Sequence, residues 1–194
     1  MELYLVRHGQ TVWNKAGKLQ GRTDIELNEN GREAAGNLGR ELENVEFDEI
    51  YSSPLIRAYE TACLIRGHRN IPIIRDERLL EISFGDGEGD SWESWNKPES
   101  PYHAFFNDTE NYVPPPHGET FEHVMERTKN FIQIVVEPQF KTAKRIMIVA
   151  HGALDSAIIC YLEGNSKANF WGKGLLKNCQ AVVFEFDGKK WRRK

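Results

Sequence analysis

Short apolar runs recur along this chain and predict a set of β-strands. Each run is bounded by turn-forming residues, which is typical of strands covered on both faces of a sheet. The clearest of them is 145–150, and Asp187-Gly188 is a turn signal after the last one. The predicted strands cover residues 2–6, 48–51, 71–74, 145–150 and 181–186.

Apolar residues at spacings of three and four lie between these runs and predict helices over about 28–42, 55–67, 119–136 and 153–162. Asn28 is placed to cap the first helix, and Ser53 the second, with Pro54 at its first position. We expect Pro138 to end the third. Because strands and helices alternate, we predict one α/β domain over 1–194. It is a three-layer sandwich whose mainly parallel sheet carries helices on both faces.

The stretch around residues 88–118 has a different character. It interleaves aromatic residues with prolines and acids, and it ends at Pro114-Pro115-Pro116. Since it is too short to build a core of its own, we interpret it as an insertion that caps the domain. We expect its aromatic residues to serve as core more than as pocket walls; they are Trp92, Trp95, Tyr102, Phe105, Phe106 and Tyr112.

Composition and charge fit an ordinary globular domain. The chain has 194 residues, 40% hydrophobic and 28% charged, with a formal net charge of -4. A general nucleic-acid binder would need a basic stripe, and we interpret the basic run 189–194 as a solvated end. No run resembles a membrane span or a signal peptide, and the three cysteines suit reduced thiols. We therefore expect a cytoplasmic enzyme or binding domain.

Two of the predicted strands end in the same dipeptide. His8-Gly9 follows the first strand directly behind Arg7, and His151-Gly152 follows the strand at 145–150. In open α/β sheets ligands bind beyond the carboxyl ends of the strands, and right-handed crossovers bring these ends to one edge. We therefore expect the two histidines to meet in one crevice, where glycine lets a ligand approach the backbone.

Arg57, in the first turn of a helix, and Glu81 follow other predicted strands and reach the same edge. Two arginines and two histidines would make a positive pocket, so we expect it to bind an anion. Phosphate is the best candidate, because each guanidinium group can donate two hydrogen bonds to phosphate oxygens. We expect the N-termini of the helices after Ser53 and Gly152 to add N–H donors. A metal site is the alternative use of the histidines, but it needs three or four ligands, and arginines repel a cation.

A series of ordered blocks resembles the histidine phosphatase superfamily, in its phosphoglycerate mutase-like branch (branch 1). The similarity runs nearly from end to end and implies the phosphoglycerate mutase-like fold. The order of the blocks makes the match specific, whereas Arg-His-Gly alone would be weak. The blocks are Leu5-Val6-Arg7-His8-Gly9-Gln10-Thr11, Gly21-Arg22-Thr23-Asp24, Ser52-Ser53-Pro54-Leu55-Ile56-Arg57-Ala58, Leu80-Glu81-Ile82-Ser83-Phe84-Gly85, Gly118-Glu119-Thr120 and Val149-Ala150-His151-Gly152.

The resemblance also implies roles for individual residues. His8 is implied to be the nucleophile that takes the phosphoryl group, and Glu81 the acid that protonates the leaving alcohol. Arg7, Arg57 and His151 are implied to hold the phosphate oxygens. The resemblance implies no cofactor and no metal. It implies further phosphate or substrate contacts from Asn14, Gln20, Gly21 and Gly152, the last through its backbone N–H.

Elementary chemistry agrees with these roles. An imidazole attacks phosphorus only when it is unprotonated, and nearby arginines disfavour a charge on His8. An alkoxide leaves poorly at neutral pH, so an acid such as Glu81 is needed. A covalent intermediate then splits the transfer into two steps, with water attacking in the second. We predict a metal-independent phosphomonoesterase of the histidine acid phosphatase type, acting on a small phosphorylated metabolite.

Two alternatives stay open. Phosphoglycerate mutases use the same chemistry, although the resembling mutases are longer and carry a C-terminal tail that closes the site. A non-catalytic phospholigand-binding domain would be expected to lack His8 or Glu81, and this chain has both. The substrate and the oligomeric state are also open, and Asp155 stands where relatives often have a basic residue. Candidate substrates are small sugar phosphates, phosphoserine, 3-phosphoglycerate and a ribazole-type nucleotide.

Overall fold

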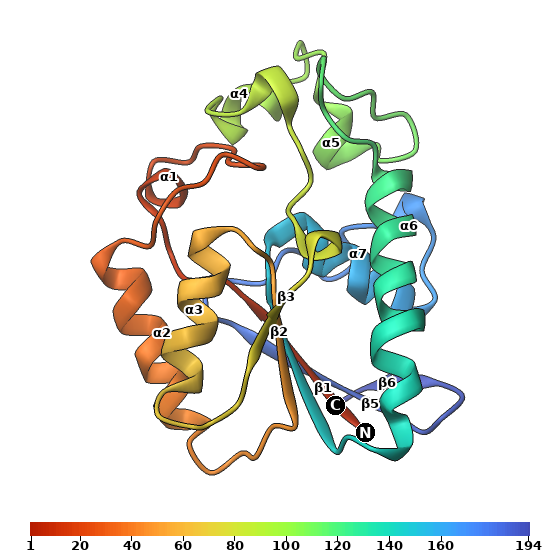
Figure 1. The fold of residues 1–194 in the computed structure, drawn as a ribbon. Coiled ribbons are helices and arrows are strands. Elements are labelled where there is room, and N and C mark those ends of the chain that lie inside the picture. Colours follow the sequence, from red (N-terminus) through yellow and green to blue (C-terminus); the bar gives the residue numbers. More distant parts are fainter.

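Six strands form one sheet in a computed structural model that describes residues 1–194 (Figure 1). The strand order is β3-β2-β4-β1-β5-β6. The first four strands of this order pair in parallel, whereas β5 and β6 are antiparallel. The predicted, mainly parallel α/β sheet is therefore confirmed. The strands are β1 (Glu2–Arg7), β2 (Glu49–Ser52), β3 (Ile73–Arg75), β4 (Arg145–Ala150), β5 (Ala181–Phe186) and β6 (Trp191–Arg193).

Helices cover both faces of this sheet, as predicted (Figure 1). On one face lie α2 (Glu29–Glu41) and α3 (Ile56–Arg66), and on the other α6 (Phe121–Phe131) and α7 (Gly152–Glu163). Three one-turn helices lie beyond the carboxyl ends of the strands, at the end of the molecule opposite the two termini. They are α1 (Val12–Lys15), α4 (Trp92–Trp95) and α5 (Ala104–Asn107).

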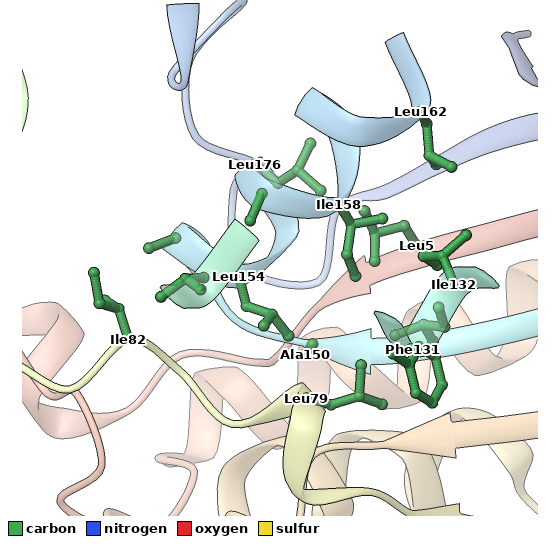
Figure 2. Packing of buried hydrophobic residues seen from close by; sticks show 14 of the residues in the cluster. Leu5, Leu79, Ile82, Phe131, Ile132, Ala150, Leu154, Ile158, Leu162 and Leu176 are labelled. Carbon is green, nitrogen blue, oxygen red and sulfur yellow. The ribbon is translucent and has the colours of Figure 1, made fainter. Parts of the chain in front are cut away.

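The alternation of side chains along β4 divides the core between the two faces. Ile146 and Ile148 pack in the larger hydrophobic cluster with α6 and α7, while Met147 and Val149 pack in the smaller one with α2 and α3. Figure 2 shows Leu5 of β1 in the larger cluster, among side chains from α6 and α7. Full burial of each large aliphatic side chain contributes about 1.5–3 kcal/mol. Both faces of the central strands are thus covered, as their unbroken apolar runs predicted.

Two predicted helix boundaries are wrong, whereas the Asn28 cap is confirmed, since its Oδ1 accepts the N–H of Gly31 (2.8 Å). The helix α3 begins at Ile56 without a side-chain cap, because Ser53 Oγ accepts from the backbone before the helix. After α6 the chain continues through a π-helical turn, 132–136, and a 3₁₀ turn, 137–141. Pro138 lies in the first positions of that 3₁₀ turn, where a missing N–H is tolerated.

The basic C-terminal run exposes Lys189, Lys190, Arg192 and Lys194 to solvent, as we expected, but part of it is also an ordered strand. Its residues Trp191 to Arg193 form β6, which pairs with β5. The Trp191 ring stacks on Phe186 with ring centroids 4.6 Å apart, and the guanidinium of Arg193 lies over the Phe184 ring. The basic residues are therefore part of a short edge strand, which adds one strand to the sheet next to β5.

The aromatic stretch 88–118 packs into the domain, as predicted, except for Trp92, which is 46% exposed. Trp95, Phe105 and Tyr112 are at most 7% exposed and belong to the same hydrophobic cluster as Phe121 of α6. The helices α4 and α5 of this stretch lie above the carboxyl edge of the sheet (Figure 1). None of the helices in the chain combines the length and apolar character that a membrane span requires.

Candidate active site

The carboxyl ends of β1 and β4 lie side by side and bring the two histidines together. The backbone N–H of His8 donates to the carbonyl of Ala150 (2.9 Å), and the ring centroids of His8 and His151 are 5.1 Å apart. Both histidines are buried, with 2% and 0% of their surface exposed. The two His-Gly strand ends therefore meet, as the strand pattern predicted.

A backbone contact fixes which nitrogen of His8 carries the proton. Nδ1 lies 2.6 Å from the carbonyl oxygen of Gly9. Because a carbonyl only accepts, Nδ1 carries the hydrogen and Nε2 keeps its lone pair. Burial, followed by the charges of Arg57 and Arg7, holds the pKa of His8 well below its usual range. The arginines thus act in the predicted direction, but burial is the larger cause of the neutral ring.

Both arginines use their terminal nitrogens to hold backbone carbonyls. Arg57 donates from Nη2 to Gly21 (2.6 Å) and from Nη1 to Thr23 (2.9 Å), and Arg7 donates from Nη1 to Leu176 (2.6 Å). The Nε atom of each arginine is buried and has no partner in the protein. Burial lowers the pKa of Arg57 to about 10, so this guanidinium is charged at neutral pH. Each arginine is therefore anchored and retains one buried donor that an anion would satisfy.

The carboxylate of Glu81 is held by backbone N–H groups. Its Oε1 accepts from Ile82 (2.9 Å) and Leu154 (3.0 Å), and its Oε2 accepts from Ala153 (3.2 Å). The last two donors belong to the first turn of α7, where the helix dipole favours negative charge. The first N–H of α3 likewise donates to Asp24 Oδ1 (2.8 Å). Protein carboxylates therefore occupy some of the N–H groups that we expected to serve phosphate, namely those of Ala153, Leu154 and Ile56. The N–H of Gly152, the backbone donor named in the prediction, donates to no protein acceptor and stays a candidate for phosphate.

Thr11 orients two amide side chains at the same edge. Its hydroxyl donates to Gln20 Oε1 (2.9 Å), and its backbone N–H donates to Asn14 Oδ1 (3.1 Å). Because both amide oxygens are engaged, the two NH₂ groups are the parts that can donate to a ligand. Gly21 adopts a left-handed backbone (φ +53°), and a Cβ there would meet Glu88 Oε1 at 2.1 Å. Glycine is thus required at this turn.

His151 and Asp155 are fully buried, yet their side-chain polar atoms have no hydrogen-bond partner in the protein. Burial and then the charge of Arg57 hold the pKa of His151 well below its usual range, so its ring is neutral. Burial and the neighbouring Glu81 raise the pKa of Asp155 well above its usual range, which favours the protonated acid over the carboxylate. The sequence marks Asp155 only as a departure from relatives, and no local pattern indicates that this acid is buried.

One cleft collects almost all of the predicted site residues. It is lined by Arg7, His8, Asn14, Gln20, Gly21, Arg57, Glu81 and Gly152. His151 lies outside this lining but against His8. No group of three or more His, Cys, Asp or Glu side chains in the chain is arranged to hold a metal ion. Sequence reasoning did not assign the other walls, which are Lys18, Leu19, Phe84, Phe105, Ala153, Trp171 and Leu175.

The site can be compared with known proteins. The sequence profile described as histidine phosphatase superfamily (branch 1) matches residues 3–194. A Hydrogenobacter thermophilus protein provisionally named phosphoserine phosphatase 2 is 39% identical over 190 residues, covering 97% of this chain and 91% of that protein. An Arabidopsis thaliana protein named metal-independent phosphoserine phosphatase is 32% identical over 196 residues, covering 98% of this chain and 78% of that protein.

A solved structure of Entamoeba histolytica phosphoserine phosphatase in complex with 3-phosphoglyceric acid has a TM-score of 0.86 and 31% identity. The match covers 99% of this chain and 94% of that one. The family match and the phosphatase names of these relatives confirm the prediction that this chain is a phosphatase.

A mutase also matches. A Parvibaculum lavamentivorans protein named 2,3-bisphosphoglycerate-dependent phosphoglycerate mutase is 31% identical over 196 residues, with 96% of this chain and 91% of that protein covered. Our expectation that such mutases are longer holds for an Arabidopsis thaliana phosphoglycerate mutase, of which the match covers 57%, but not clearly for this one, so chain length alone does not separate the two activities. The profile match, the relatives and the paired His-Gly strand ends agree on one conclusion. The chain belongs to the histidine phosphatase superfamily, branch 1.

Proposed function

We propose that this chain hydrolyses small phosphate monoesters, without a metal ion, through a phosphohistidine intermediate on His8. The observation that carries the proposal is a set of buried donors around one free imidazole nitrogen. The Nε atoms of Arg7 and Arg57 and both ring nitrogens of His151 have no protein partner. Phosphoryl oxygens would satisfy the two arginine donors and the single N–H that a neutral His151 ring carries, while the phosphorus atom meets Nε2 of His8.

In the first step the bond between Nε2 of His8 and phosphorus forms, and the bond from phosphorus to the leaving oxygen breaks. The arginine donors stabilise the charge of the transferred group, and removal of one such donor typically lowers the rate about 10²–10³-fold. Glu81 enters this step in its protonated form, gives that proton to the leaving oxygen and leaves the step as the carboxylate. Its Oε2 has room for that proton because it accepts one backbone hydrogen bond, whereas Oε1 accepts two.

In the second step a water molecule attacks phosphorus, and the bond from phosphorus to His8 breaks. The carboxylate of Glu81 takes a proton from this water, so both residues return to their starting states. The products are the alcohol and inorganic phosphate. A mutase would return the phosphoryl group to a second hydroxyl of the bound product instead of to water, which makes mutase activity the second candidate function.

We propose that the substrate is a small phosphorylated metabolite, with phosphoserine and 3-phosphoglycerate as the first candidates. The names of the phosphoserine phosphatase relatives motivate this choice. Beyond the phosphate donors the cleft is lined by Lys18 and by the aromatic side chains Phe84, Phe105 and Trp171. A panel of phosphate monoesters, with a phosphoglycerate mutase assay run in parallel, tests this choice. Higher turnover to a phosphorylated isomer than to free phosphate would favour the mutase.

The intermediate is tested with a ³²P-labelled monoester, rapid quenching and acid treatment in the presence of a chelator. We expect an acid-labile phosphoenzyme in the wild-type chain and in His68→Ala, which removes an exposed histidine, but none in His8→Ala. In Glu81→Gln we expect a larger loss on alkyl phosphates than on p-nitrophenyl phosphate, whose leaving group needs no proton. Label retained in His8→Ala, or activity that requires added metal, would contradict the proposal. Binding of phosphate without turnover would favour a non-catalytic domain.

A further inference from the structure

Arg127 of α6 lies outside the cleft but holds the backbone segment that carries Glu81. Its Nη1 donates to the carbonyls of Arg78 and Leu80, both at 2.7 Å, and its Nη2 donates to the carbonyl of Glu81 at 3.2 Å. The side chain of Arg127 is only 10% exposed. One guanidinium group therefore fixes three carbonyls in the segment that ends at Glu81.

Glu119 holds Arg127 in this orientation. Its Oε1 accepts from Arg127 Nε (2.8 Å) and its Oε2 from Arg127 Nη2 (2.9 Å), a bidentate pair in which the carboxylate side chain is 4% exposed. Glu119 also bonds to the far side of the same segment. Its backbone N–H donates to the Ser83 carbonyl (2.8 Å), and its Oε2 accepts the Ser83 N–H (3.3 Å).

On its backbone carbonyl side the segment around Glu81 has one further, weaker support, since Arg22 donates from Nε to the Glu81 carbonyl (3.5 Å) and from Nη2 to Glu119 Oε2 (3.3 Å). The segment lies between two single 3₁₀ turns, 77–79 and 85–87, and belongs to no strand or helix. Its carbonyls are therefore not fixed by a hydrogen-bond ladder. The carboxylate of Glu81 is attached to α7 by backbone N–H groups, so its position depends on α7 at one end and on Arg127 at the other.

We propose that Arg127, oriented by Glu119, is a positioning residue that aligns the acid Glu81 with the leaving oxygen of the substrate. The inference rests on the proposed function, in which Glu81 donates the proton. Arg127 is not among the residues that line the cleft, although its charge is among those that lower the pKa of His151. It donates no hydrogen bond to His8 or His151, so we expect its loss to affect phosphate binding and attack by His8 less than it affects the acid. Its loss displaces the acid, and a misplacement of 1 Å in such a group lowers the rate about 10²-fold.

The test compares Arg127→Met with Arg69→Met. Arg69 also holds backbone carbonyls, those of Arg66 (2.9 Å), Leu42 (3.0 Å) and Val45 (3.0 Å), but it lies between α3 and β3, at the end of the sheet opposite the cleft. In Arg127→Met we expect kcat for an alkyl phosphate to fall about 10- to 100-fold and kcat for p-nitrophenyl phosphate less than about threefold, with KM little changed. We expect Arg69→Met to change both rates equally, if at all.

A double-mutant cycle separates positioning from a purely structural role. Once Glu81→Gln has removed the acid, Arg127→Met is expected to have no further effect on the alkyl phosphate. Arg127→Lys keeps the charge but not the planar fork, and we expect it to show the same selectivity with a smaller loss. It also serves as the test variant if circular dichroism shows that Arg127→Met is unfolded.

Three outcomes would overturn the inference: equal losses on both substrates, no loss on the alkyl phosphate, or full additivity with Glu81→Gln. The proposed function fails separately, if the wild-type chain forms no phosphoenzyme or if Glu81→Gln lacks selectivity between the two substrates.

Discussion

Gly31, in the first turn of α2, offers a sharp test of how the fold positions His8. An alanine Cβ at this residue would lie 2.2 Å from the carbonyl oxygen of Gln10 and 2.7 Å from its nitrogen. Ordinary contact begins at 3.4 Å, so the helix and the loop after β1 would have to separate by roughly 1 Å. Both partners are backbone atoms, and the Gln10 carbonyl also accepts from the Asn28 N–H (2.9 Å), so neither yields easily.

The size of the effect follows from two opposing contributions. Alanine in place of glycine in a helix stabilises the folded state by about 1 kcal/mol, whereas overpacking against fixed atoms destabilises it by about 1–3 kcal/mol. We expect Gly31→Ala to lower the free energy of unfolding by up to about 2 kcal/mol. The displaced loop also contains Gly9, whose carbonyl holds Nδ1 of His8. A shift of this size in the nucleophile lowers kcat/KM by up to about 10²-fold.

Gly36 provides a control within the same helix. Its nearest neighbour for a Cβ is Arg40 Nη1 at 3.8 Å, the end of a flexible side chain. We expect Gly36→Ala to raise the free energy of unfolding by about 0.5–1 kcal/mol with unchanged activity. Urea denaturation measures the stabilities, and hydrolysis of p-nitrophenyl phosphate measures kcat/KM. If Gly31→Ala matches Gly36→Ala in both measurements, the close contact between α2 and the nucleophile loop does not position His8.

The raised pKa of buried Asp155 means that the unfolded chain loses its proton first, so stability decreases as the pH rises above about 3.9. Asp155→Asn should remove that decrease, and unfolding curves between pH 4 and 8 that keep the wild-type slope would contradict it. The lowered pKa of His8 has the opposite sign, because the unfolded chain takes up a proton below about pH 6.5. Acid unfolding of His8→Gln should therefore begin at a lower pH than that of the wild-type chain. Arg57→Met should reduce kcat/KM about 10²–10³-fold. We expect a small change in the thermal midpoint, because the burial that lowers the pKa of Arg57 to about 10 also makes its charge costly in the folded state.

The sequence predicted those parts of the fold in which a continuous run of apolar residues marks a buried strand. β1 and β4 read as unbroken apolar runs, and because parallel strands end at one edge, the pattern alone could place Arg7, His8 and His151 together. The edge strand β6 could not be predicted in this way. Its pattern is dominated by basic side chains, and the contacts that join it to the neighbouring strand are the backbone pairing and the stacking of Trp191 on Phe186.

The assignment of donors within the site depends on contacts that no local pattern encodes. A sequence shows that the first turn of α7 has free N–H groups, and phosphate is a reasonable acceptor for them. In the structure, the acceptor is Glu81, which is 72 residues from Ala153 along the chain. The phosphate must then rely mainly on side-chain donors, which raises the importance of the free Nε atoms of Arg7 and Arg57. The hydrogen bonds from α7 to Glu81 also fix the position of the acid. Backbone N–H groups therefore position the acid, while the arginines compensate the negative charge of the phosphate.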